Sequence, residues 1–224
     1  MGYHYGRTHH GGGAADGIKE HSRMGISVIF TIGIVAVAWG LSSYHKQKTF
    51  KNLLGHLQRG EYDAYYDLLE APLTKFHYPK FNRQFMKLNG LIAQGRHHTV
   101  EEQLQELLDG KATADQRREL VLKAFDYYVG RKKKRQAQEL LQEIRSWNEP
   151  ATSKACERLY DIILLGSSEH IAEMEAELAE KESPSERQYM EILLAMQYKS
   201  KGDKEKEQEY LKRAEEDLSA ADGK

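Results

Sequence analysis

Five glycines recur along the chain at a nearly constant spacing, and this repeat constrains the fold more than any other feature. Gly60, Gly95, Gly130, Gly166 and Gly202 are separated by 35, 35, 36 and 36 residues. Each follows one apolar stretch and precedes another, as LLGHLQRG precedes EYDAYYDLLEA. Glycine adopts a left-handed backbone without a Cβ clash, so we expect each one to end a helix and let the next fold back. The spacing therefore predicts five helix pairs that stack on a continuous core.

Helix-start signals and prolines fall where this repeat requires them. Three segments have the form of a capping box, in which a Ser or Thr and a Glu or Gln three residues later cap the helix start: Thr99 with Glu102, Thr113 with Gln116, and Ser183 with Glu186. The prolines stand where one pair should end and the next begin: Pro72, Pro79, Pro150 and Pro184. Since proline breaks a helix interior, this placement favours an all-α fold. We expect an αα-solenoid over residues 46–220 and a disordered end at residues 221–224.

The last pair shows the pattern of a known repeat most clearly. In LLAMQYKSKGDKEKEQEYLKRA, the positions that carry it are Leu194, Ala195, Tyr198, Gly202, Tyr210 and Ala214. This arrangement resembles the tetratricopeptide repeat, and the first pair keeps part of it in Gly60, Tyr62, Leu69 and Pro72. Departures stand at Tyr65, Arg135 and Glu207, where the family usually has alanine, and at Lys132 and Ser168, where it has an aromatic residue. Because the family's usual period is about 34 residues, a related class such as Sel1-like repeats stays open, and either class implies stacked helix pairs with a concave face.

A block of twenty uncharged residues precedes the repeats. At about 1.5 Å per residue, residues 24–43 (MGISVIFTIGIVAVAWGLSS) are long enough to cross a hydrocarbon core of about 30 Å. The block is longer than the apolar region of a usual signal peptide, so we expect an uncleaved transmembrane helix. Residues 1–23 are rich in glycine and histidine without an apolar period, and we expect them to be disordered. Within the span, Ala36 and Gly40 form a small-xxx-small pair that favours contact with a second transmembrane helix.

The orientation of the predicted anchor depends on the basic residues at its two ends. Arg7, Lys19 and Arg23 precede it, and Lys46, Lys48, Lys51 and Arg59 follow it. This small excess favours a single-pass membrane protein whose repeat domain lies on the cytoplasmic side, although the opposite orientation stays open. The sole cysteine, Cys156, excludes an internal disulfide, agrees with a reducing compartment, and is expected to be a small buried residue.

Composition and motifs argue against several classes of function. A net charge of -1 gives no overall field to attract nucleic acid, so we expect no nucleic-acid partner. The sequence contains no nucleophile elbow, no HExxH motif and no phosphate-binding glycine loop. We therefore predict that the protein is not an enzyme and requires no metal or other cofactor.

Three sets of residues are candidates for partner contacts. If the tetratricopeptide phase holds, the first-helix positions facing a peptide groove include Asn82, Phe85, Asn89, Arg117 and Tyr127. The densest basic run is a candidate surface for an anionic partner, although a solvated turn is favoured: Arg131, Lys132, Lys133, Lys134 and Arg135. The aromatic residues of the first two pairs are expected to be mostly core: Tyr62, Tyr65, Tyr66, Phe76, Tyr78, Phe81 and Phe85.

These features together favour a membrane-anchored scaffold or adaptor that binds a protein or peptide partner. By the resemblance, Phe50 and Leu54 stand where chaperone-binding family members carry polar clamp residues, so chaperone-tail binding is not implied. The alternative is an accessory subunit of a membrane complex, such as a protein translocation or assembly machine. A lipid-binding module or an enzyme without a recognisable motif is a weaker third hypothesis.

Overall fold

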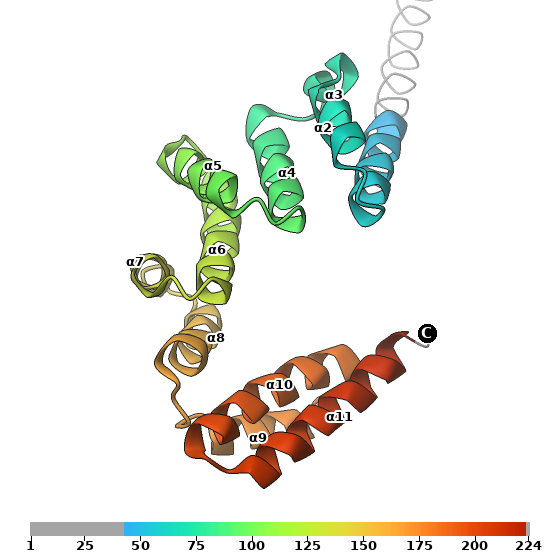
Figure 1. Ribbon diagram of the computed structural model, residues 1–224. Helices are drawn as coiled ribbons and strands as arrows, with labels where there is room; N and C mark the ends of the chain where they lie inside the picture. Colours follow the sequence, from blue (N-terminus) through green and yellow to red (C-terminus); the bar gives the residue numbers. More distant parts are fainter. Residues whose placement is uncertain (1–42, 223–224) are drawn as a thin grey trace, which may run out of the picture. The chain divides into compact units, whose positions relative to one another are not determined.

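The computed structural model describes residues 43–222, and the regular secondary structure in this range is entirely helical (Figure 1). The all-α prediction is thus confirmed. A helix over residues 43–58 is followed by α2 (Tyr62–Glu70), α3 (Pro72–His77), α4 (Lys80–Ala93), α5 (His97–Asp109), α6 (Ala114–Gly130), α7 (Lys134–Arg145), α8 (Pro150–Tyr160) with a π-helical turn η1 (Asp161–Leu165), α9 (Ile171–Ala179), α10 (Pro184–Lys201) and α11 (Lys204–Asp222).

The predicted N-terminal segments lie outside the described residues. These are the tail at residues 1–23 and the transmembrane helix at residues 24–43, which includes the Ala36 and Gly40 pair. Of the predicted transmembrane helix, only residue 43 is described. Among residues 43–222, no helix combines the length and the apolar character that a bilayer crossing requires.

Left-handed residues lie in six of the inter-helix turns of residues 43–222: glycine supplies four of them, and Lys132 and Asn148 the other two. Gly60, Gly95, Gly166 and Gly202 have φ values of 70°, 71°, 67° and 82°, as the repeat predicts. The prediction for Gly130 is wrong, because Gly130 is the last residue of α6 and Lys132 takes the left-handed conformation instead, at φ 56°. There the Lys133 N–H donates to the Tyr128 carbonyl over 2.8 Å, which closes the turn around a residue with a Cβ.

The helix starts agree with the sequence signals in part. The capping box at Thr113 is confirmed, since its hydroxyl accepts from the Gln116 N–H at 3.3 Å and the Gln116 amide oxygen accepts from the Thr113 N–H at 3.0 Å. Ser183 does precede α10, but its hydroxyl contacts the Ser185 hydroxyl instead of a backbone N–H. The Thr99 prediction is wrong, because α5 already begins at His97.

Proline marks the helix starts as expected. The first residues of α3, α8 and α10 are Pro72, Pro150 and Pro184, and Pro79 caps α4. At the first helical position, the missing proline N–H leaves no hydrogen bond unmade.

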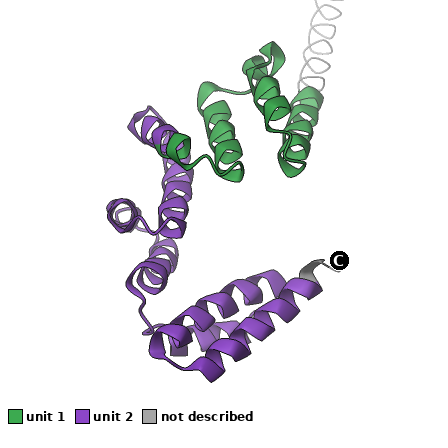
Figure 2. Cartoon of the chain, viewed as in Figure 1, with its two compact units in different colours: residues 1–101 green, residues 102–224 purple. Residues whose placement is uncertain are grey.

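The described chain divides into two compact units, residues 43–101 and 102–222 (Figure 2). In the first unit, Leu53 of the first helix packs with Tyr65 and Leu69 of α2 in a small buried cluster. The Tyr65 hydroxyl donates to the Met86 carbonyl of α4 over 2.6 Å, and burial raises the pKa of Tyr65 to about 12. This aromatic residue therefore joins α2 to α4.

Gly90 allows α4 to approach α2 closely. A Cβ at Gly90 would lie 2.7 Å from the Tyr65 Cε1 atom and 3.2 Å from the Tyr66 Cε1 atom. Both rings belong to α2, and Tyr65 is only 3% exposed, so the ring has no free space to move into. The close packing of these two helices thus depends on the missing side chain.

In the second unit, α6 packs along α7 and α7 along α8. The inward faces supply a buried apolar core: Leu120, Val121, Ala124, Phe125, Ala137, Leu140, Leu141 and Ile144. Arg117 of α6 donates to both carboxylate oxygens of Glu143 on α7, at 2.8 and 2.7 Å. The same guanidinium also donates to the Leu108 carbonyl, so Arg117 ties three successive helices together.

The C-terminal end of this unit is built by α10, which packs against both α9 and α11. The rings of Tyr198 and Tyr210 stack at 5.6 Å, and both hydroxyls donate to the Glu175 Oε1 atom over 2.7 Å. Glu191 on α10 is 1% exposed and accepts from the Arg213 Nε atom of α11 at 3.1 Å. Its Oε2 atom has no hydrogen-bond partner within the described residues.

Candidate binding groove

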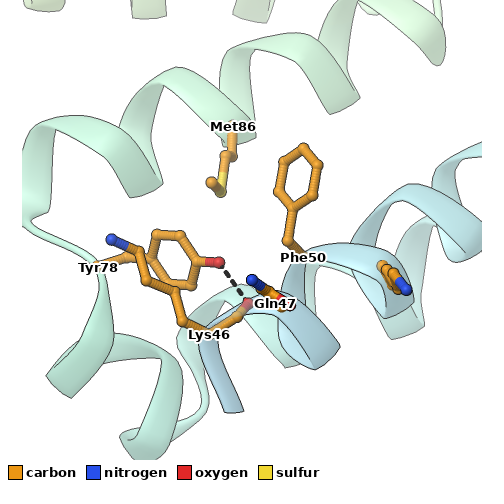
Figure 3. A pocket seen from close by; sticks show the side chains of 6 residues that line it. Lys46, Gln47, Phe50, Tyr78 and Met86 are labelled. Atoms are coloured by element: carbon orange, nitrogen blue, oxygen red, sulfur yellow. Dashed lines mark hydrogen bonds between the residues drawn. The ribbon is translucent and has the colours of Figure 1, made fainter. Parts of the chain in front are cut away.

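An open apolar groove lies in the first unit, between the helix over residues 43–58 and α4 (Figure 3). Its volume is about 380 Å³, and its lining residues are Lys46, Gln47, Phe50, Lys51, Tyr78 and Met86. On the first helix, Phe50 is 51% exposed and lies beside a buried stripe that contains Thr49 and Leu53. Side chains one residue apart on a helix point about 100° apart, which places Phe50 beside the core instead of in it.

Tyr78 forms a rigid wall of the groove. The residue directly follows α3 and is 5% exposed. Its hydroxyl donates to the Lys46 carbonyl over 2.8 Å, and the Lys46 ammonium lies 5.4 Å from the centre of its ring. Burial raises the pKa of Tyr78 above its usual range, so the hydroxyl stays protonated and keeps its donor role at neutral pH.

The rim of the groove is basic. Lys46 and Lys51 are exposed, and neither forms an ion pair within residues 43–222. Residues 43–101 contain nine lysines and arginines against five aspartates and glutamates, whereas residues 102–224 contain 21 against 27. The groove therefore combines an apolar floor of Phe50 and Met86 with cationic groups at its edge, which suits a bulky apolar side chain next to a carboxylate.

The residues that the sequence predicted for a peptide groove fall into two sets. Asn82, Phe85 and Asn89 lie on α4, the helix that also supplies Met86, and Phe85 stacks on Phe81 at 6.0 Å. Arg117 and Tyr127 lie on α6 in the second unit, where Arg117 is held by Glu143 and Tyr127 is 8% exposed. The side chains of Arg117 and Tyr127 thus take part in the packing of helices within the second unit.

The basic run forms the turn between α6 and α7. Arg131 follows the last residue of α6, Lys133 precedes α7, and Lys132 is the left-handed residue between them. Lys134 and Arg135 are the first two residues of α7. All five except Lys133 are exposed, and Arg135 lies 3.7 Å from Glu139 one turn later. The favoured interpretation as an exposed inter-helix turn agrees with this placement.

The aromatic residues of the first two pairs are mostly buried or half-buried, with one exception. Tyr65 and Tyr78 are core residues as expected, but Phe76 is 82% exposed, so the prediction is wrong for Phe76. Cys156 is buried as predicted, and burial raises the pKa of its thiol to about 11. Such a thiol is poorly reactive.

The sequence alone did not predict this groove, although it contains a signal for it. Phe50 and Leu54 are an apolar pair one turn apart, and they are 51% and 44% exposed. They lie outside the stripe formed by Leu53 and Leu57. A helix with a second apolar stripe indicates a second contact surface, but the partner side chain on α4 becomes evident only in the folded unit.

Within residues 43–222, no three histidine, cysteine or acidic side chains are gathered as metal ligands. Comparisons with protein-family models, curated proteins and solved structures gave no match to this chain.

Proposed function

We propose that this protein is a membrane-anchored adaptor with a tetratricopeptide-like αα-solenoid, and that it binds a peptide segment of a partner protein in the groove beside its anchor. The observation that carries the proposal is the open groove lined by Phe50, Tyr78 and Met86. Exposing an aromatic ring and a methionine in one concave site is unfavourable in water, and such sites are typical of ligand recognition.

The helix order supports the solenoid part of the proposal. Gly60, Gly95, Lys132, Gly166 and Gly202 each separate two helices, and of these couples α6 packs along α7 and α10 along α11. The helix α3 is additional to this series, and a sixth left-handed residue, Asn148, separates α7 from α8. These five residues, Asn148 not among them, are 35, 37, 34 and 36 residues apart. The buried residues of the last pair include Leu194, Tyr198 and Tyr210, which are the positions of the family pattern.

The position of the groove supports the anchor part. The uncharged block at residues 24–43 leads directly into the helix that carries Lys46, Phe50 and Lys51. A partner bound there would be held within a few helical turns of the bilayer. Tethering raises the local concentration of such a partner for other membrane components.

The binding proposal is tested by selecting peptides from a displayed library with the full chain in lipid nanodiscs. We expect enriched sequences with one bulky apolar residue beside Asp or Glu. Truncating a central anchor residue of a binding site commonly costs about 1–2 kcal/mol, so Phe50→Ala should weaken binding about tenfold. Lys51→Glu should also weaken it.

The matched control is Leu211→Ala, which truncates a similarly exposed apolar side chain on α11 of the second unit. Peptides that bind wild type, Phe50→Ala and Leu211→Ala equally would refute the groove. The anchor is tested separately: the full chain should resist alkaline carbonate extraction from membranes, and a chain that is released would refute a transmembrane helix.

A further inference from the structure

The short helix α3 has its apolar side chains on the outside. Leu73 and Phe76 are three residues apart and so share one face, and they are 49% and 82% exposed. The inward face carries Thr74, which is 1% exposed, and leads to Tyr78. A soluble helix normally has the reverse arrangement, so this outward apolar face indicates a contact surface.

This face lies close to the start of the described chain, where the predicted membrane segment ends. The Tyr78 hydroxyl, at the end of α3, donates to the carbonyl of Lys46 over 2.8 Å, and Figure 1 shows α3 at the same end of the first unit as the start of the blue helix over residues 43–58. Lys46 is three residues past the uncharged block, which is about 5 Å along a helix. The headgroup layer on each side of a bilayer is about 5–8 Å thick, so a helix emerging from the membrane would bring α3 to its surface.

Charge complementarity identifies the occupant as an anionic lipid surface. Residues 43–101 have an excess of four basic over acidic residues, although the whole chain has a net charge of -1. Lys46 and Lys48 are exposed near the start of the first helix, where Tyr44 is 61% exposed. Lys80 is exposed at the start of α4, shortly after α3. Aromatic rings beside lysines are the composition of interfacial membrane contacts.

We infer that α3 docks on the anionic surface of the bilayer that holds the anchor, with Phe76 and Leu73 inserted among the headgroups. The inference rests on the anchored arrangement proposed above and adds a second membrane contact to it. Two contacts, one at residue 43 and one at α3, fix the first unit against the bilayer. The groove then opens at a defined height above the membrane surface.

A polarity-sensitive fluorophore at position 76 tests the inference in the full chain. The label is attached to Phe76→Cys in a Cys156→Ala background, and the protein is reconstituted into vesicles with or without 30% phosphatidylserine. The matched control is Leu54→Cys, at an apolar site of the same unit that is 44% exposed and lies about 16 Å along the helix from residue 43. Spin-labelled lipids report contact with the bilayer, and iodide reports contact with water.

We expect lipid quenching at position 76 that exceeds quenching at position 54 severalfold and that falls in vesicles without phosphatidylserine. Full iodide access at position 76, in a chain that resists carbonate extraction, would overturn the docking and leave the anchor standing. Shielding from iodide without lipid quenching would indicate a protein contact and would also overturn it. Release of the chain by carbonate would refute the anchor itself and the inference together.

Discussion

The close approach of α4 to α2 predicts that Gly90→Ala destabilises the first unit. Alanine in a helix interior normally gains up to about 1 kcal/mol over glycine. At Gly90 the new Cβ would lie 2.7 Å from a Tyr65 ring atom, and the ring is held by its hydrogen bond to Met86. Overpacking of this kind costs about 1–3 kcal/mol, so after the helix-propensity gain is subtracted we expect a net loss of up to about 2 kcal/mol.

The matched control is Gly55→Ala in the same unit. Its Cβ would lie 3.1 Å from the Arg59 Nη1 atom, the far end of a flexible side chain, so Gly55→Ala should stabilise the protein. Urea unfolding of the full chain, followed by far-UV circular dichroism, should move the midpoint down by roughly 0.5–1 M for Gly90→Ala and slightly up for Gly55→Ala. Equal upward shifts would refute the reasoning, since they would show that Tyr65 moves aside without cost.

Three further changes test the turn, the helix cap and the buried carboxylate by the same urea assay. Lys132→Gly replaces a residue that has a Cβ and a left-handed backbone, and it should stabilise the second unit by about 1 kcal/mol. Gly130→Ala should not destabilise this unit, because the new Cβ meets nothing within 4 Å. If both substitutions destabilised the unit, the left-handed turn would have to lie at Gly130. Thr113→Ala should cost about 1 kcal/mol, whereas Ser183→Ala should change stability by less than about 0.5 kcal/mol because its hydroxyl caps no backbone N–H; equal losses would refute the assignment of the caps. Burial raises the pKa of Glu191 above its ordinary 4.5, so the folded state holds this proton more tightly than the unfolded chain does. The stability of wild type relative to Glu191→Gln should therefore fall as pH rises from 4.5 through the folded-state pKa, and a rise over that window would contradict the raised pKa.

The regular part of the fold follows from glycine spacing, because a left-handed turn is a local property of one residue. Gly60, Gly95, Gly166 and Gly202 behave as this rule requires. Lys132 shows its limit: hydrogen bonds from the turn to Tyr128 and Val129 stabilise the left-handed conformation in a residue with a Cβ. A count of glycines alone therefore places this turn two residues early.

The contact surfaces were harder to predict, since they depend on which side of a helix the rest of the chain leaves uncovered. Phe76 is expected to be a core residue because its side chain is aromatic, but in α3 the buried side chain is that of Thr74. The groove likewise requires Met86 of α4 to lie near Phe50, 36 residues earlier. No helical periodicity in the sequence shows that Met86 and Phe50 are close in space. The aromatic residues of the first two pairs therefore marked this part of the chain without showing which of them are buried and which are exposed.

The opposite charge balance of the two units has a consequence for the kinetics of association. Long-range attraction speeds the encounter of oppositely charged surfaces, and added salt screens it. An acidic partner that docks on residues 43–101 should associate more slowly as ionic strength rises. For the same partner, an encounter with residues 102–224, where acidic residues outnumber basic ones, should become faster. The sign of the salt dependence of the association rate would thus identify the unit that an acidic partner meets first.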